Sequence, residues 1–208
     1  PDLPACNVQA AAYLLPAYTQ YLPADTVCLC VVDPGVGTDR RALALRIDGR
    51  WFVGPDNGLF SLLVRRGRDV LVNEIHWRPD TLSDSFHGRD LFAPIAAGLA
   101  MGKVDGLGAI DPGQLLVPDW PNELAEVIYL DRYGNAITGL TADALPDTAI
   151  LDIAGHRCHY CRTFAEAGHS TLFWYRNSNG LVEIAMNQAD ASACAGLCVG
   201  EPIAFVPG

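Results

Sequence analysis

The sequence predicts an α/β domain over residues 1–113, followed by a mostly β domain over residues 114–208. Two observations carry this prediction. In the first part, apolar runs with helical spacing alternate with short apolar runs that are typical of buried strands. After Gly113, the apolar runs are short and bounded by turn residues, which favours a small β-barrel or sandwich.

The α/β domain is predicted from its apolar periodicity, taken from the N-terminus onwards. Apolar residues over residues 7–21 recur with helical spacing, although Pro16 lies within this stretch. Further helices are expected over residues 59–66, after a strong turn signal, and over residues 92–101. Strands are expected over residues 27–32, 42–47, 51–54 and 70–77.

The β domain follows a connector over residues 115–120 that contains proline. No later apolar run is long enough to predict a helix with the same clarity. Strands are expected over residues 127–130, 136–140, 148–151, 172–175, 181–185 and 202–206. Short strands at this spacing are typical of an all-β domain.

The amino-acid composition limits the kinds of molecule that this protein can bind. Half of the residues are hydrophobic and 18% are charged, as in a globular protein. Lys and Arg number 14 against 24 Asp and Glu, which gives a net charge of −10. Nucleic acids and anionic membrane surfaces require a basic face, so we predict neither as a partner. The acidic balance is compatible with a cationic small molecule, and no apolar run approaches the ~20 residues of a membrane span.

The cysteines are odd in number and follow no framework spacing. They are Cys6, Cys28, Cys30, Cys158, Cys161, Cys194 and Cys198. Several lie in apolar runs, where cysteine behaves as a small hydrophobic residue. Reduced cysteines in a cytoplasmic protein are therefore favoured over a disulfide scaffold.

One cluster of cysteines and histidines has the composition of a zinc site. It contains His156, Cys158, His159 and Cys161. The same residues also read as a strand with alternating faces, on which ligands three positions apart would point to opposite sides. The strand interpretation is favoured, and we predict no metal site.

The strongest candidate for chemistry is an acid at the end of a predicted strand. Asp33 follows the run over residues 27–32 and opens a Gly-rich turn that ends near Arg40. In open α/β sheets, ligands bind at the carboxyl ends of strands. His87, from a distant loop, could join Asp33 and Arg40 around one water, since imidazole can take a proton near neutral pH and arginine favours an anionic oxygen. The alternative from spacing alone is a structural ion pair beside an unrelated histidine.

Two further motifs combine turn residues with groups that can bind a ligand. Residues 56–58, Asp-Asn-Gly, have the composition of a tight turn and nothing more. In residues 131–135, Asn135 could pair with an adenine edge, Tyr133 could stack on the base and Asp131 could hold an ammonium group. The sequence contains no Walker-type phosphate loop and no G-x-S-x-G elbow.

These motifs together resemble the S-adenosyl-L-methionine (SAM) hydroxide adenosyltransferase family, the SAM-hydrolysing relatives of the fluorinase and chlorinase enzymes. Residues 32–40 are similar to that family's D-P-G-V-G-T-x-R, residues 55–58 to its P-D-N-G, residues 86–90 to its F-H-G-R-D, residues 131–135 to its D-x-F-G-N, and residues 177–180 with 183–185 to its N-S-x-G and E-I-A. Five motifs in the right order make a specific match that covers essentially the whole chain.

The resemblance implies an α/β domain with a central sheet between helices and a C-terminal β-barrel, assembled as a homotrimer. The active site would lie between the first domain of one subunit and the barrel of the next. The implied reaction is attack of activated water on the ribose C5′ of SAM, which releases adenosine and methionine and needs no cofactor. Since a sulfonium is a good leaving group, the protein must mainly position and activate the nucleophile.

The resemblance also assigns roles by position. Asp33, Arg40 and His87 would be the water-activating residues. Asp131 would hold the methionine amino group, and Ser178 would help to hold its carboxylate. Tyr133 would stack near adenine and Asn135 would contact the base. Phe86, Gly88 and Asn57, from the matching motifs, complete the expected substrate-binding residues.

Two departures from the family pattern keep an alternative open. The family begins with a strand whose Asp binds the ribose hydroxyls, whereas this chain begins near the later stretch over residues 2–8, so a first β-α unit is expected to be absent. Residues 186–188, Met-Asn-Gln, also differ near the expected adenine contact. The alternative is a catalytically weak protein that binds adenosine or SAM. A halogenase is disfavoured, because the halogenases carry Tyr where this chain has Asp33.

Overall fold

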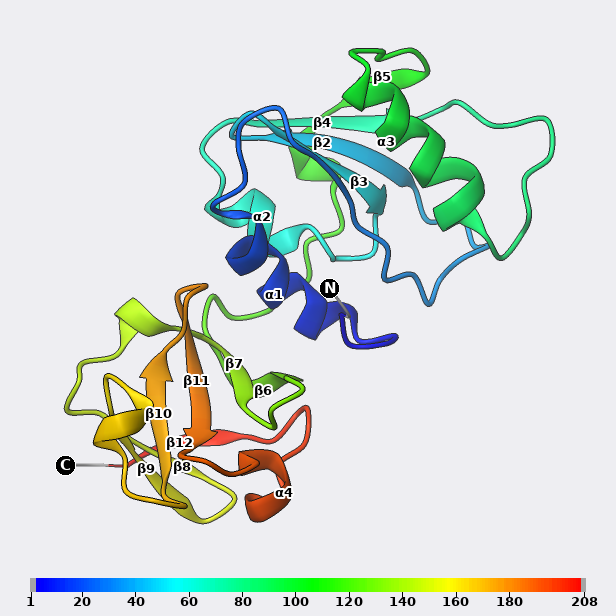
Figure 1. The fold of residues 1–208 in the computed structure, drawn as a ribbon. Helices are drawn as coiled ribbons and strands as arrows, with labels where there is room; N and C mark the ends of the chain where they lie inside the picture. The colour runs from blue at the N-terminus through cyan, green and yellow to red at the C-terminus, as the bar shows by residue number, and fades with distance from the viewer. Residues whose placement is uncertain (1–2, 207–208) are drawn as a thin grey trace. The chain divides into compact units, whose positions relative to one another are not determined.

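The computed structural model describes residues 3–206, and the chain divides into two compact units, Pro1–Asp119 and Trp120–Gly208. The predicted fold class is confirmed: the first unit is α/β and the second consists mostly of strands (Figure 1). The first unit extends through the connector because side chains hold it there. The backbone N–H of Leu116 donates to the Asp56 carboxylate at 3.0 Å, and Arg65 donates to the carbonyl of Pro118 at 3.2 Å.

The first unit is built on one five-stranded sheet. Its strand order is β1 (Val27–Leu29), β3 (Arg50–Pro55), β2 (Ala42–Ile47), β4 (Val70–Ile75) and β5 (Leu107–Ile110). Strand β1 runs parallel to β3, and the other neighbouring pairs are antiparallel. Strand β1 therefore lies at one edge of the sheet, and the chain leaves the sheet from its carboxyl end.

Helices cover both faces of this sheet (Figure 1). Helices α1 (Val8–Thr19) and α2 (Ser61–Arg66) contribute to the cluster that contains Leu43 of β2. Helix α3 (Ala93–Ala100) packs in a second cluster with Ala44 of the same strand. Successive side chains of a strand point to opposite faces, and both faces of β2 are covered, so every residue of this strand except Arg46 is apolar.

Three elements of the first unit differ from the sequence prediction. Strand β1 ends at Leu29, although the N–H of Cys30 still donates to the carbonyl of Val53 at 2.8 Å. The helix expected from residue 92 is preceded by a π-helical turn, η1 (Gly88–Phe92), which runs into α3. Strand β5 was not predicted, because three of its four residues are partly buried, Ala109 is exposed, and the strand carries little apolar periodicity.

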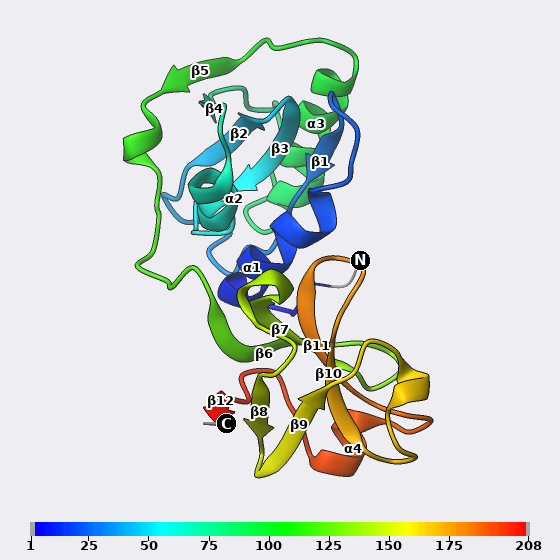
Figure 2. The same cartoon turned by 90° about the vertical axis from the view of Figure 1, so that its left-hand side faces the viewer.

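The second unit is a single curled sheet of seven strands (Figure 2). In spatial order they are β12 (Ile203–Val206), β8 (Ile150–Ile153), β9 (His156–Tyr160), β10 (Leu172–Arg176), β11 (Leu181–Met186), β7 (Ala136–Thr141) and β6 (Leu124–Leu130). The sheet curls until its edges meet, since Glu126 of β6 forms a bridge with Pro202 beside β12. This closure makes the unit barrel-like, and a sandwich is excluded.

Short elements complete the described chain: η2 (Pro112–Gln114), η3 (Ala142–Ala144), η4 (Phe164–Glu166) and α4 (Ala191–Ala195). No helix within residues 3–206 is long and apolar enough to span a membrane. All seven cysteines are free thiols. The candidate zinc residues lie on or just after β9, where Cys158 is fully buried in the core and His156 is exposed. Among residues 3–206, no three His, Cys, Asp or Glu side chains gather as a metal site would require.

Candidate functional site

The Gly-rich turn after β1 is closed by its own backbone. The N–H of Val36 donates to the carbonyl of Asp33, and the N–H of Thr38 donates to that of Gly35. Gly37 has a φ of +81°, and a Cβ at this position would lie 2.9 Å from the carbonyl oxygen of Asp84. Only glycine combines this conformation with so close an approach. The turn and the loop that leads to His87 are thereby brought together.

The structure places Asp33, Arg40 and His87 in one cluster. The Arg40 Nε donates to the two carboxylate oxygens of Asp33 at 2.9 and 3.1 Å, and the Arg40 Nη2 donates to Oδ2 as well. The same Nη2 lies 3.0 Å from the Nδ1 of His87. The guanidinium also lies over the ring of Phe92, with Cζ 5.2 Å from its centroid. The arginine is thus fixed by a carboxylate, an imidazole and an aromatic face.

This cluster is largely shielded from solvent. The Asp33 and Arg40 side chains are 6% and 9% exposed, so their ion pair is a buried one. Burial is the main cause that lowers the pKa of His87 from its usual 6.5, and the Arg40 charge lowers it further. The charges of Asp33 and Asp84 raise this pKa, and the charge of Arg78 lowers it as that of Arg40 does. His87 is therefore a neutral imidazole at pH 7.

The contact with Arg40 also determines which nitrogen of His87 carries the proton. A guanidinium can only donate, so Nδ1 must accept, and the proton of the neutral ring lies on Nε2. The lone pair at Nδ1 is then occupied, and the free edge of the ring presents an N–H. An oxygen held at this edge would meet a donor beside the positive charge of Arg40, an environment that favours hydroxide over water.

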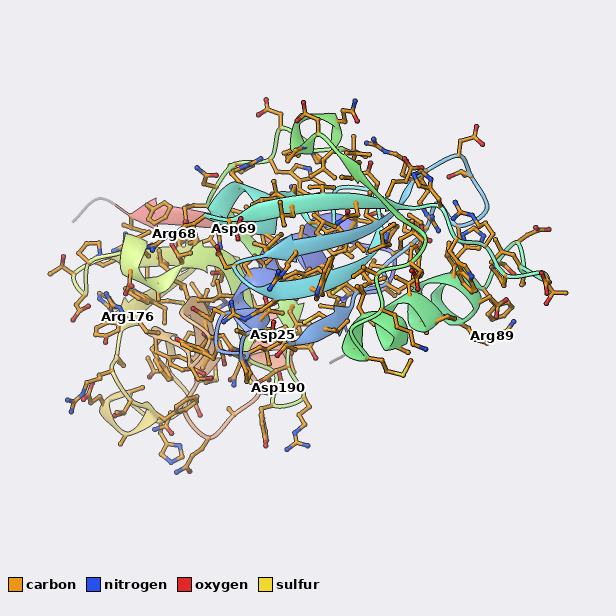
Figure 3. The ribbon with its side chains drawn as sticks, turned by 90° about the horizontal axis from the view of Figure 1, so that it is seen from above. Asp25, Arg68, Asp69, Arg89, Arg176 and Asp190 are labelled. Atoms are coloured by element: carbon orange, nitrogen blue, oxygen red, sulfur yellow. The ribbon has the colours of Figure 1, made fainter. Side chains whose placement is uncertain are left out.

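The residues that flank His87 in the chain differ in exposure and in their contacts. Phe86 is 56% exposed, and the guanidinium of Arg89 lies 4.8 Å from its ring centroid. Arg89 points outward and pairs with Asp90 at 2.5 Å (Figure 3). A Cβ on Gly88 would make ordinary contact with Val31, at 3.5 Å, so nothing within this unit requires glycine there.

Asn57 lies next to the same strand end but bonds to backbone. Its Nδ2 donates to the carbonyl of Val32 at 2.8 Å, and its Oδ1 accepts from the N–H of Leu59 at 3.2 Å. Since Val32 directly precedes Asp33, this amide fixes the position from which the Gly-rich turn starts. Neighbouring Asp56 accepts from Arg41 at 2.9 Å and from the N–H of Leu116, so it has a structural partner on each side.

The second unit contains a pocket of about 860 Å³. Its lining brings together all four predicted residues of this unit: Asp131, Tyr133, Asn135 and Ser178. The remaining lining residues are Ile137, Phe164, Tyr175, Asn177, Asn179, Glu183, Met186, Gln188 and Ala189. Residues 131–135, residues 177–179 and the sheet face between them therefore form one concave surface.

Asp131 organises the loop that leads into β7. Its Oδ1 accepts from the N–H groups of Tyr133 and Asn135 at 2.8 and 2.9 Å, and its Oδ2 accepts from the Asn135 side chain at 3.1 Å. Gly134, with a φ of +82°, packs so closely on Asp190 that a Cβ would overlap the carboxylate. Asp190 (Figure 3) in turn caps α4 by accepting from the N–H of Ala193 at 2.8 Å.

Tyr133 and Asn135 have different environments within this loop. Tyr133 is 64% exposed; the Arg132 guanidinium lies 4.8 Å from its ring centroid and donates to its hydroxyl at 2.7 Å. Asn135 is buried, and its amide donor is given to Asp131. Its amide oxygen and its second amide N–H remain as groups that can meet a ligand.

Sequence reasoning missed the residues on the floor of the pocket. Glu183 of β11 is buried, and its two oxygens accept from the hydroxyl of Tyr175 at 2.5 Å and the amide of Asn177 at 3.0 Å. Tyr175 and Glu183 are direct cross-strand partners. Burial and the hydrogen bond to Glu183 raise the pKa of Tyr175, so its hydroxyl stays a donor. The available signal was a single acid within the apolar run Leu181–Met186.

The fold and the two sites together define a class of protein. A buried acid, arginine and histidine at a strand end, with a separate polar and aromatic pocket, are the parts of an enzyme that activates a nucleophile against a small bound molecule. Family models for the SAM hydroxide adenosyltransferase N-terminal domain and C-terminal domain match residues 1–108 and 125–204. The chain belongs to the SAM hydroxide adenosyltransferase family.

Full-length relatives agree with this assignment. The chain is 40% identical to an (R)-S-adenosyl-L-methionine hydrolase of Thermus thermophilus, over 97% of this chain and 84% of the relative. It is 36% identical to a protein of the same name from Salinispora arenicola, over 99% of this chain and 84% of the relative.

Solved structures confirm the fold. A conserved protein from Thermotoga maritima superposes with a TM-score of 0.86 at 28% identity, over 97% of this chain and 85% of that one. A conserved hypothetical protein from Thermus thermophilus has a TM-score of 0.78 at 38% identity, over 98% of this chain and 84% of that one.

Proposed function

We propose that this enzyme hydrolyses SAM to adenosine and L-methionine. The observation that carries the proposal is the buried cluster of Asp33, Arg40 and His87, in a chain whose relatives are named SAM hydrolases. An oxygen–carbon bond forms at the ribose C5′ as the C5′–sulfur bond breaks, and the bonding pair leaves with sulfur as the thioether of methionine. The proton lost by the attacking water passes to solvent.

The three residues have separate tasks in this proposal. His87 donates its Nε2–H to the nucleophilic oxygen and orients it. The charge of Arg40 favours the hydroxide form of that oxygen. Asp33 holds Arg40 in place and balances its charge, while Asn57 fixes the strand end through Val32. The leaving group is already activated as a sulfonium, so this reaction requires neither a metal nor a cofactor.

The pocket of the second unit would bind the substrate. Asp131 takes the amino group, Ser178 contributes to the carboxylate site, Tyr133 stacks near adenine and Asn135 contacts the base. These four residues line one pocket, which supports their acting on one molecule. Phe86 and Gly88 would approach the substrate from beside His87.

The two halves of the site belong to different units, which suits an assembly that shares its sites. We propose a homotrimer in which the cluster of one subunit meets the pocket of the next. Cytoplasmic location is proposed with it, because all seven cysteines are free thiols, as a reducing compartment requires.

The direct test incubates the purified chain with SAM of each sulfonium configuration and measures adenosine and methionine by chromatography. We expect equal amounts of both products, without chloride, and unchanged turnover after treatment with a metal chelator. The relatives' names specify the R configuration, so each epimer is assayed separately. Binding of SAM by calorimetry without product would instead identify a binding protein.

Shared sites predict rescue between two inactive variants. His87→Ala removes the donor of one half-site, and Asp131→Ala removes the acid of the other. After the two proteins are unfolded and refolded together, some interfaces combine two intact halves, so activity is expected to return to about a quarter of the wild-type level when subunits mix randomly. Mixtures that stay as inactive as the separate variants would contradict the shared site, and sedimentation measures the trimer itself.

The environment of His87 predicts a titration that can be followed directly. Burial and Arg40 lower its pKa, so its NMR signal is expected to titrate with a midpoint below 6.5. Arg40→Met removes one lowering charge and leaves Asp33, which raises the pKa, so the midpoint is expected to move upward. Comparison with His87→Ala assigns the signal. An unchanged midpoint in Arg40→Met would contradict the contact between Arg40 and His87.

A further inference from the structure

We infer that the pocket of the second unit selects its substrate by positive charge and makes little use of the α-carboxylate. The enzyme would therefore also hydrolyse the decarboxylated sulfonium, in which a 3-aminopropyl chain replaces the 3-amino-3-carboxypropyl chain of SAM. This inference rests on the proposed function and adds a second substrate class to it. It follows from the charges and hydrogen bonds of the residues that line the pocket.

The first observation is a buried carboxylate without a cationic partner in the pocket. Glu183 is 5% exposed and accepts from two neutral donors, the Tyr175 hydroxyl and the Asn177 amide. A carboxylate has about four acceptor sites, so these two bonds leave capacity for a ligand. A negative charge in such a place is costly unless a positive charge compensates it. A bound sulfonium or ammonium would supply that charge.

The second observation concerns the other acid of the same pocket. Asp131 uses its Oδ1 for two backbone N–H groups, while its Oδ2 accepts only from the Asn135 amide at 3.1 Å. The Oδ2 atom therefore keeps a free acceptor site. Both acids line the pocket, so the cavity carries two negative charges.

The third observation is that the lining of this pocket supplies no matching positive charge of its own. None of the residues that line this pocket, all of which the structure describes, is Lys, Arg or His. The adjacent Arg132 is exposed, and it is engaged by the ring and hydroxyl of Tyr133. For a carboxylate the pocket offers the neutral groups of Ser178, Asn177 and Asn179, of which Asn177 already binds the loop backbone.

The chemistry does not need the carboxylate either. The bond that forms joins oxygen to C5′, and the bond that breaks joins C5′ to sulfur, several atoms from the carboxylate. With the decarboxylated substrate the products are adenosine and the corresponding aminopropyl methyl thioether, and water supplies the oxygen as before. The substrate gains a net positive charge relative to SAM, which two facing carboxylates favour.

The test compares the two sulfoniums as substrates of the wild-type enzyme. We expect kcat/KM for the decarboxylated compound to lie within about tenfold of that for SAM, or above it. A value more than about tenfold lower would show that the carboxylate is used and would overturn the inference. Failure to hydrolyse either compound would contradict the proposed function instead. In that case calorimetry decides: the decarboxylated sulfonium should bind at least as tightly as SAM, and the thioether S-adenosylhomocysteine, whose sulfur is uncharged, at least about tenfold more weakly.

Two variants and a control identify which charged side chain selects the substrate. Glu183→Gln is expected to lower kcat/KM about tenfold for SAM and further for the decarboxylated compound, which carries one more net positive charge. Asp143→Asn is the matched control, because it removes an exposed negative charge of the same unit outside the pocket. Arg132→Ala tests the adjacent cation: a loss confined to SAM would assign the carboxylate to Arg132 and overturn the inference.

Discussion

His87→Ala is expected to lower the rate of adenosine release by about 10²–10⁴-fold while leaving the fold intact. The imidazole presents its Nε2–H on a free edge, since its Nδ1 is occupied by the Nη2 of Arg40. The side chain is half-buried at the start of η1 and belongs to neither apolar cluster of the first unit. Its removal therefore affects the nucleophile more than the packing.

The measurement is kcat and KM for SAM together with a thermal unfolding curve. A loss in kcat with KM nearly unchanged would match a residue that acts on the nucleophile. His156→Ala is the matched control, because that histidine is exposed on β9 of the other unit, and its turnover should equal that of the wild type. Undiminished turnover in His87→Ala would remove the residue from the mechanism.

Asp33→Ala is expected to abolish activity and also to destabilise the first unit by about 3–5 kcal/mol. The reason is the buried ion pair: Arg40 is 9% exposed and cannot lose its proton, so removal of its carboxylate leaves an uncompensated charge. Thermal or denaturant unfolding measures the loss of stability, and the adenosine assay measures the loss of turnover.

The double variant Asp33→Ala with Arg40→Ala separates the two effects. With the charge and its partner both gone, the unfolding free energy should recover part of the loss, although activity stays abolished. A double variant that is destabilised by the sum of the two single changes would show that the pair is not coupled.

Much of this fold could be predicted, because the pattern of apolar residues along each strand follows from which faces of that strand are buried. Leu43 and Ala44 pack in clusters on opposite faces of the sheet, so residues 42–45, which contain them, are apolar at every position. The length of β1 could not be predicted. Its apolar run continues to Val32, but the hydrogen bonds to β3 end near Cys30, where the chain leaves the sheet. The length of a strand depends on the strand with which it pairs, which lies far away in the sequence, and the spacing of its own apolar residues does not reveal it.

The site could be predicted where a motif carries its own geometry. Asp33 and Arg40 lie seven positions apart around one glycine turn, so their pairing follows from local chain direction. Glu183 and Tyr175 could not be found in this way. They meet only because β10 and β11 pair in a particular register, and a register error of one residue would turn each to the other face.

Each unit contains a cysteine thiol in its core. Cys30 belongs to the cluster packed between α1 and the sheet, and Cys158 to the core of the curled sheet. Burial raises the pKa of both, that of Cys158 to about 12, so neither forms a reactive thiolate while its own unit is folded. The two thiols can therefore report on unfolding separately. The rate at which Cys30 is alkylated would measure the opening of the first unit, and the rate at which Cys158 is alkylated would measure the opening of the second.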